Sequence, residues 1–334
     1  MTQPREHDDP ALAVRDLRVR FRTGREDVLA VKDVSFTVQP SETLAIVGES
    51  GSGKSATCLA IPRLLPGTAE VRGSIRFGGR ELLELSQREL RHVRGKEIGL
   101  IYQDPMAALN PVRTIGAQIS EVVRLHLKMS RRAARERSAE LLNAVGVTPA
   151  RRQLRAYPHE FSGGMRQRVV IAMAIACEPK LVIADEPTTA LDVSIQAQIL
   201  LLLRKLASEQ NISLVFVSHD LSVVAGLADK VAVMYAGTLV EYASALELYE
   251  SPVHPYTRAL LAAIPDRDHI PITPRLEQTT RAVNGERSTE GCPFRRRCPS
   301  ASGQCTKIPE LTETAANHFV ACWRAEEGGQ GGKG

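Results

Sequence analysis

One stretch of this chain, Gly48-Glu49-Ser50-Gly51-Ser52-Gly53-Lys54-Ser55, matches the phosphate-binding pattern G-x-x-x-x-G-K-S/T. An apolar run, Thr43 to Val47, comes directly before it and is typical of a buried parallel strand. Glycines let the backbone bring several N–H groups close to an anion, and the dipole of the helix expected from about Gly53 favours the same anion. The sequence therefore predicts a strand, a loop and a helix that bind the phosphates of a nucleotide.

The residue types in this loop predict separate roles. Lys54 would reach the β- and γ-phosphates, and the Ser55 hydroxyl would ligate magnesium. The remaining residues expected around the phosphates are Gly48, Ser50, Gly51, Ser52 and Gly53. The alternative is a Gly/Ser turn before an ordinary helix, and it is disfavoured because the strand–loop–helix context is present.

Two further apolar runs end in polar residues. The run from Leu181 to Ala184 is followed by Asp185, placed to hold magnesium, and by Glu186, which would accept a proton from an attacking water. The run from Ser213 to Val217 is followed by His219. Ligands of open α/β sheets bind at this edge of the sheet, so we expect these side chains to share a site. The alternatives are a solvated acidic pair and a structural histidine.

A second candidate anion site lies at Ser162-Gly163-Gly164, before the apolar run Val169 to Ala176. Serine is a favoured N-cap, and two glycines leave backbone amides exposed to an anion. One nucleotide in one small domain does not need both this helix start and the first loop.

Composition limits the class of protein. The chain has 334 residues, 43% of them hydrophobic and 24% charged, as expected for one full soluble domain with an appendage. No apolar stretch reaches the ~18 residues that span a bilayer, and the polar start indicates no signal peptide. We therefore expect a cytoplasmic location. The net charge of +5 is mild, and the arginines between 131 and 155 are expected to form a solvated helix face rather than a nucleic-acid surface.

Pattern changes divide the chain into regions. We expect disorder over residues 1–10 and 326–334, and a nucleotide-binding domain over 11–250. Within that domain, alternating strands up to about residue 80 predict an antiparallel layer, and helical periodicity over about 105–165 predicts a helical subdomain. Residues 251–325 form a separate C-terminal region.

The C-terminal region contains four of the six cysteines, and the other two, Cys58 and Cys177, read as buried core thiols. Clustered cysteines in a cytoplasmic chain favour metal over disulfides. Their spacing is C-x5-C-x6-C-x16-C, without the C-x2-C pairs usual for zinc, and both zinc and an iron–sulfur cluster stay open. The four candidate ligands are Cys292, Cys298, Cys305 and Cys322.

The phosphate loop, the Ser162-Gly163-Gly164 segment, the acidic pair and His219, in this order, resemble the ATP-binding cassette (ABC) family. The resemblance implies an α/β fold: a P-loop NTPase core with a RecA-like sheet, an antiparallel β layer and an inserted helical subdomain. It also implies a dimer in which Ser162, Gly163 and Gly164 of one subunit cover the ATP bound by the other. Phe161 and Met165 depart from the commonest form of that segment, but its Ser-Gly-Gly core is intact.

The same resemblance implies roles for individual residues. Gln103 would contact magnesium and the attacking water, and His219 would sense the γ-phosphate. Asp192 would cross the dimer interface, and the ring of Phe21 would stack on adenine. The alternative for Phe21 is a core position in an edge strand.

Longer segments resemble the ATPases of oligopeptide, dipeptide and nickel importers: Tyr102 to Pro111, Tyr157 to Arg168, Pro187 to Val193, the His254-Pro255-Tyr256-Thr257 segment and the four-cysteine tail. This resemblance implies an ATPase that powers peptide import across the bacterial plasma membrane from its cytoplasmic side. Implied partners are a second, homologous ATPase subunit, two transmembrane permeases and an extracytoplasmic peptide-binding protein, with no nucleic acid. Relatives with this tail carry a 4Fe–4S cluster, which we prefer over zinc.

Two other functions are weighed against peptide import. An importer of nickel or another small solute is one alternative, because the ATPase subunit does not touch the cargo. A soluble ABC ATPase acting on nucleic acid is disfavoured, because such proteins usually carry two cassettes or a long coiled-coil insertion.

Overall fold

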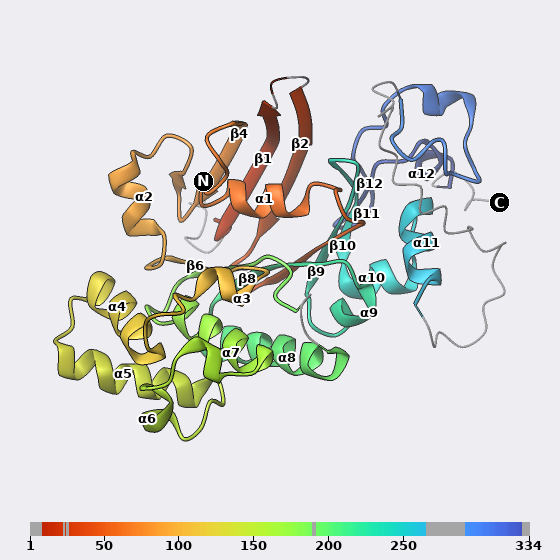
Figure 1. Ribbon diagram of the computed structural model, residues 1–334. Coiled ribbons are helices and arrows are strands. Elements are labelled where there is room, and N and C mark those ends of the chain that lie inside the picture. The colour runs from red at the N-terminus through yellow and green to blue at the C-terminus, as the bar shows by residue number, and fades with distance from the viewer. Residues whose placement is uncertain (1–8, 23, 25–26, 189–191, 265–290, 329–334) are drawn as a thin grey trace, which may run out of the picture. The chain divides into compact units, whose positions relative to one another are not determined.

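A computed structural model describes residues 9–22, 24, 27–188, 192–264 and 291–328 (Figure 1). The chain divides into two compact units. The first consists of Met1–Leu44 and Ser55–Val217, and the second of Ala45–Lys54 and Ser218–Gly334. The buried strand β3 (Thr43–Val47) contributes residues to both units. Within the described residues, no helix is both long and apolar enough to cross a membrane.

The first unit begins with the predicted antiparallel layer. Its four-stranded sheet has the order β2-β1-β4-β5, and its strands are β1 (Leu12–Arg22), β2 (Asp27–Val38), β4 (Ala69–Phe77) and β5 (Arg80–Glu81). Leu12 lies opposite both Val38 and Phe77, and all three side chains are buried. Alternating apolar residues thus form one buried face of this sheet.

Three parallel strands form the core of the same unit. They are β6 (Ile98–Ile101), β7 (Leu181–Ala184) and β8 (Ser213–Ser218). β7 pairs with β6 on one side and β8 on the other, so that Ala184 lies opposite Ile101 and Phe216. All residues of β7 are buried, as expected for a parallel strand covered on both faces. The polar residues that follow β6 and β7 therefore emerge at one edge.

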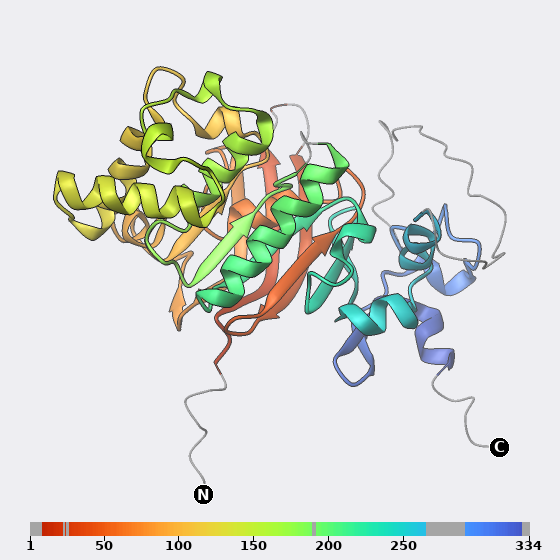
Figure 2. The same ribbon diagram turned by 90° about the horizontal axis from the view of Figure 1, so that it is seen from below.

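Helices account for most of the remaining first unit. They are α1 (Lys54–Ala60), α2 (Gln87–Val93), α3 (Pro105–Ala108), α4 (Ile115–Leu127), α5 (Arg131–Ala144), α6 (Ala150–Gln153), η1 (Pro158–Glu160), α7 (Gly163–Ala174) and α8 (Val193–Glu209). α4, α5 and α7 pack on one another (Figures 1 and 2). The side chains of Thr114 and Ser130 cap α4 and α5, as their residue types favour. This group lies in the stretch expected to be a helical subdomain.

The second unit contains an antiparallel sheet with the order β9-β10-β12-β11. Its strands are β9 (Lys230–Tyr235), β10 (Thr238–Ser244), β12 (His318–Val320) and β11 (Thr312–Ala315). Its helices are α9 (Leu221–Val224), α10 (Ala245–Glu250), α11 (Pro255–Ala262), η2 (Gly303–Thr306) and α12 (Trp323–Gly328). The pairing of β12 with β10 joins the cysteine-bearing segment to the strands that precede it.

The end of α12 corrects one sequence expectation. Residues 326–328 were expected to be disordered, but they belong to this helix. The indole N–H of Trp323 donates to the carbonyl oxygen of Lys307 at 3.1 Å and anchors the start of the helix. Residues 1–8 and 329–334, also expected to be disordered, lie outside the described part of the chain.

Candidate functional site

The phosphate loop follows β3, as predicted, and its glycines have structural reasons. A Cβ on Gly48 would lie 2.2 Å from the carbonyl oxygen of Met234, so no larger residue fits there. Gly53 has a φ of 98°, which L side chains rarely adopt. The Ser52 hydroxyl is buried, and no described residue offers it a hydrogen bond. A buried hydroxyl without a protein partner in this loop is suited to donate a hydrogen bond to a phosphate oxygen.

Lys54 lies inside the loop rather than in solvent. Its side chain is buried, and its Nζ donates to the carbonyl oxygens of Gly48 at 2.7 Å and Glu49 at 2.9 Å. The ammonium group is therefore held against the loop backbone, as expected of a group that meets the phosphates.

Two of the three predicted magnesium ligands are in contact. The Ser55 Oγ donates to Oδ1 of Asp185 at 2.8 Å, and Asp185 is nearly buried at the end of β7. The backbone N–H of Asp185 donates to the carbonyl oxygen of Ile101, which fixes it beside β6. A carboxylate next to a hydroxyl is an oxygen-donor set that Mg²⁺ prefers, so these residues fit the ion.

Gln103 lies beside the predicted general base. Its Nε2 donates to Oε2 of Glu186 at 3.2 Å. Glu186 has a φ of 44°, in the left-handed region that costs an ordinary residue about 1–2 kcal/mol. Strained residues gather at functional sites, because the surrounding structure must hold them. The hydrogen bond of Ser55 with Asp185 links the start of α1 to the end of β7. The hydrogen bond of Gln103 with Glu186 links the residues after β6 to the same end of β7.

His219 follows the end of β8 directly. The turn around it is fixed by its neighbours: the backbone N–H of Asp220 donates to the Ser218 hydroxyl at 3.0 Å, and that hydroxyl donates to the Asp220 carbonyl oxygen at 3.1 Å. The histidine therefore has a defined backbone position after the strand. Its contact with a γ-phosphate stays a prediction.

The Ser162-Gly163-Gly164 segment starts a helix, as predicted. The Ser162 hydroxyl accepts from the backbone N–H of Met165 and caps α7, and Ser162 and Gly163 are exposed. A Cβ on Gly164 would lie 2.9 Å from the Ile195 side chain of α8. Gly164 thus allows close helix packing, while the two residues before it present the helix start to solvent.

Two residues assigned by resemblance have less defined surroundings. Asp192 is exposed at the N-terminus of α8, but its side chain makes no capping hydrogen bond. Phe21 pairs with Val28 and Ala69 near the end of β1 and is half-buried. Contact of Asp192 with a partner and stacking of Phe21 on adenine stay predictions.

The four C-terminal cysteines line one pocket, within the segment 291–328 that we call the cysteine region. The backbone N–H of Cys292 donates to the Cys305 carbonyl oxygen at 2.9 Å. Burial raises the pKa of the Cys292 and Cys298 thiols, so a nearby cation would be needed to ionise them near neutral pH. His254 and Phe294 also line the pocket. The cysteines are separated in sequence but share one site.

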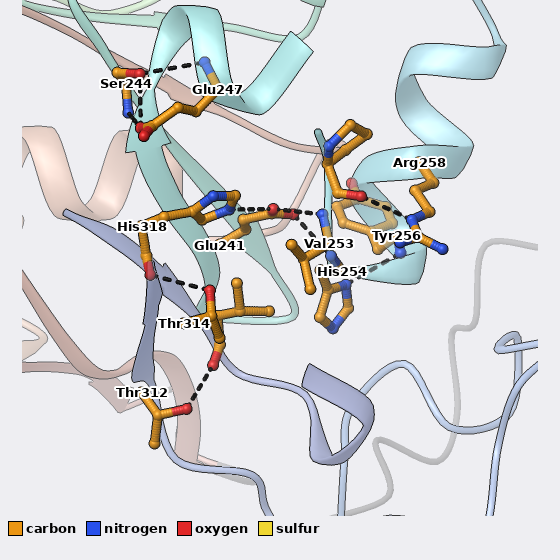
Figure 3. A network of polar contacts seen from close by, with 12 residues as sticks. Glu241, Ser244, Glu247, Val253, His254, Tyr256, Arg258, Thr312, Thr314 and His318 are labelled. Atoms are coloured by element: carbon orange, nitrogen blue, oxygen red, sulfur yellow. Dashed lines mark hydrogen bonds and ion pairs between the residues drawn. The ribbon is translucent and has the colours of Figure 1, made fainter. Parts of the chain in front are cut away.

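Sequence analysis missed several residues around this region. Glu241 is fully buried and accepts from the backbone N–H groups of Val253 at 2.8 Å and His254 at 3.0 Å, and its Oε1 lies 2.8 Å from Nε2 of His318. Figure 3 shows these contacts joining β10, β12 and the start of α11. The available signal was an acidic residue inside the apolar strand β10, which requires buried partners.

Comparison with known proteins places these features in a family. Residues 31–189 match the model of the ABC transporter family. The oligopeptide transport ATP-binding protein OppD of Escherichia coli is 49% identical over 96% of this chain and 94% of its own length. The chain belongs to the ABC transporter ATPase family. As a member, this ABC subunit binds and hydrolyses ATP.

Other relatives agree with this assignment. Residues 240–305 of this ABC subunit match the model described as the oligopeptide/dipeptide transporter C-terminal region. The dipeptide transport ATP-binding protein DppD of Bacillus subtilis is 45% identical, over 96% of both chains. A solved ATP-binding cassette, a dimer bound to ADP and phosphate in a post-hydrolysis state, is 28% identical and covers 70% of this chain and 98% of its own, with a TM-score of 0.63.

Proposed function

We propose that this ABC subunit powers the import of oligopeptides or dipeptides across the bacterial plasma membrane. The observation that carries the proposal is the match of residues 240–305 to the oligopeptide/dipeptide transporter C-terminal region. Relatives named for peptide transport, similar over nearly their whole length, support it over nickel or nucleic acid. The subunit would bind two permeases at the cytoplasmic side of the membrane. An extracytoplasmic peptide-binding protein would deliver peptides to those permeases.

The proposed mechanism assigns each contact a step. Lys54 and the buried Ser52 hydroxyl bind phosphate oxygens, and Phe21 stacks on adenine. Glu186 takes a proton from a water whose oxygen attacks the γ-phosphorus, and the bond to the ADP oxygen breaks. Gln103, hydrogen-bonded to Glu186, orients that water, and His219 contacts the γ-phosphate.

The magnesium ligands would be Ser55 and Asp185, with Gln103 nearby. When bound, Mg²⁺ supplies positive charge that neutralises the phosphate oxygens. The carboxylate of Asp185 and the Ser55 hydroxyl, 2.8 Å apart at their oxygens, hold two oxygen donors together for it.

The proposed active unit is a dimer with a homologous ATPase subunit. The exposed start of α7, at Ser162 and Gly163, offers N–H groups to an anion, but this chain already has a phosphate loop. A γ-phosphate on the partner's nucleotide is the ligand that fits, together with the exposed Asp192 crossing the interface. The dimeric cassette among the solved structures supports this arrangement.

We also propose that the four cysteines hold a 4Fe–4S cluster. They line one pocket, yet no group of three or more His, Cys, Asp or Glu in the described segments is arranged to hold a single metal ion. The sequence spacing of the four cysteines lacks the C-x2-C pairs usual for zinc, and this wider spacing favours a larger cluster over the alternative, one zinc ion.

Transport is tested in a bacterial strain lacking its own copy of this subunit but retaining its partners. Wild type and the exposed-surface control Glu209→Gln should restore uptake of a labelled peptide, whereas Lys54→Ala should not. Restored uptake of nickel without any uptake of peptide would overturn the peptide proposal.

The cluster is tested by anaerobic purification of the full chain with iron, sulfide and zinc assays. About four irons and four sulfides per chain are expected, lost in Cys298→Ser and retained in the control Cys177→Ser. One zinc without iron in the wild type would refute the cluster.

A further inference from the structure

The phosphate loop contacts two residues that its sequence motif does not contain. Arg297, next to Cys298, forms a two-pronged ion pair with Glu49, with Nη1 2.8 Å from Oε2 and Nη2 2.9 Å from Oε1. The backbone N–H of Glu49 donates to the hydroxyl of Tyr256 at 2.9 Å. The carbonyl oxygen of the same Glu49 accepts from Lys54. One loop residue is thus held at its carboxylate, its N–H and its carbonyl oxygen.

The two residues that hold Glu49 are themselves fixed by aromatic packing. The buried Tyr256 ring lies 4.7 Å from the Tyr235 ring and 5.5 Å from the Phe294 ring, measured between centroids. The Arg297 guanidinium lies over the rings of Tyr235 and Phe294, 5.8 Å and 5.7 Å from their centroids. Arginine stacked on aromatic rings keeps its planar donors in one orientation.

The helix that carries Tyr256 is also anchored. Nδ1 of His254 accepts from the backbone N–H of Tyr256 at 3.1 Å, and the backbone N–H of His254 donates to the buried Glu241 (Figure 3). Burial raises the pKa of Tyr256, so its hydroxyl stays neutral and can accept the Glu49 N–H. The acceptor therefore has a fixed position and a fixed protonation state.

The charge of Glu49 explains why this arrangement matters for nucleotide binding. A carboxylate in the loop repels the phosphates of ATP unless a cation neutralises it. Arg297 does so through its two hydrogen bonds to Glu49, and its guanidinium group stays charged, as arginine does in proteins. The two side chains remain almost half exposed, at 44% and 43%, so the ion pair adds little to folding stability. Its main effects are on the position and the charge of the loop.

We propose that Arg297 and Tyr256 are positioning residues for ATP binding, through which the C-terminal part of the chain sets the affinity of the phosphate loop for nucleotide. Arg297 cancels the charge of Glu49, and Tyr256 holds the backbone of the loop. This inference depends on ATP binding alone and not on the transported solute or on the cluster.

The test measures equilibrium binding of a fluorescent ATP analogue to the purified full chain. Arg297→Gln leaves an uncompensated carboxylate and should weaken binding about 3–10-fold, as expected for one repulsive charge near the phosphates. Glu49→Gln combined with Arg297→Gln removes that charge and should restore most of the affinity. Tyr256→Phe keeps the ring but removes the acceptor, and should weaken binding about 3-fold.

The matched control is Arg295→Gln, which removes the same charge from the same loop. The Arg295 side chain is exposed and, among the described residues, has no hydrogen bond to the phosphate loop. The Arg295→Gln variant should bind the ATP analogue with the same affinity as the wild type. Unchanged affinity in Arg297→Gln, or a double variant as weak as Arg297→Gln, would overturn the proposal. Neither result depends on peptide uptake, so the transport proposal would stand.

Discussion

The residues of the proposed hydrolysis site follow strands that pair over several residues, whereas the cysteine region consists mainly of turns with short-range backbone hydrogen bonds and two short strands. Asp185 and Glu186 follow β7, whose register with β6 and β8 is continuous. The cysteine region has two strands, of four and three residues, and depends on contacts such as that of His318 with the buried Glu241. Many backbone hydrogen bonds between paired strands hold a site at strand ends, whereas fewer interactions hold a site on loops.

This difference predicts two kinds of response to substitution. Changes at the strand ends should remove chemistry and leave the fold intact, because the strands hold their register without those side chains. Changes at the anchors of the cysteine region should lower stability even where no ligand is touched. The following experiments compare the two regions, beginning with the largest expected effect.

Glu186→Gln should lower the rate of ATP hydrolysis about 10²–10⁴-fold, because an amide cannot take the proton of the attacking water. ATP binding and the thermal midpoint of unfolding should be unchanged. Phosphate release, nucleotide binding and thermal unfolding are measured on the same preparation, with Glu209→Gln as control. A wild-type rate of ATP hydrolysis in Glu186→Gln would show that Glu186 is not the general base.

Glu241→Ala should lower the free energy of unfolding of the second unit by about 2–5 kcal/mol. The backbone N–H groups of Val253 and His254 would lose their acceptor in a buried site, at roughly 1–3 kcal/mol for each unsatisfied group. Denaturant unfolding measures the loss, and the exposed Glu250→Ala on α10 serves as control. A loss no greater than that of the control would show that the buried network is not an anchor.

Gly291→Ala should destabilise the cysteine region by about 1–3 kcal/mol, the usual cost of an unfavourable backbone angle. Gly291 has a φ of 80°, and an added Cβ would lie 2.4 Å from the Cys305 carbonyl oxygen. Gly303→Ala is the matched control, because a Cβ there meets no atom within 4 Å. Limited proteolysis should distinguish the two variants, and equal resistance would contradict the prediction.

The smallest effect is expected from pH at His126, in α4. Burial, with added repulsion from Lys96 and His92, lowers the pKa of His126 in the folded chain. The unfolded chain then binds a proton at higher pH than the folded chain, so stability falls as pH drops below the ordinary histidine pKa of about 6.5.

His126→Gln should therefore reduce the loss of stability between pH 7 and pH 5. Thermal midpoints at the two pH values provide the measurement, with His159→Gln as a control at an exposed histidine of η1. An unchanged pH dependence in His126→Gln would show that this residue does not contribute.

The sequence predicts the strand-end region more fully than the cysteine region, for a physical reason. The apolar runs at 43–47, 181–184 and 213–217 correspond to β3, β7 and β8. Parallel strands place their carboxyl ends at one edge of the sheet. A local pattern is therefore enough to predict that the polar residues following these strands lie close together. The helix at Ser162 is likewise predicted from local residue types.

The contacts of the cysteine region leave no such pattern. Arg297 and Glu49 are separated by 248 residues, and nothing local to either indicates its partner. β11 and β12 are too short for alternation to reveal them. The pocket lined by the four cysteines could be predicted as a shared ligand site, but not the residues that support it.

The ion pair between Glu49 and Arg297 also has a consequence during biosynthesis. At roughly 5–20 residues per second, the ribosome adds Arg297 about 12–50 seconds after Glu49, which precedes it by 248 residues. During that interval the nascent chain carries a complete phosphate-loop motif whose glutamate has no arginine to neutralise it. Until Arg297 is added, the charge next to the phosphate loop of the nascent chain therefore differs from that in the folded subunit.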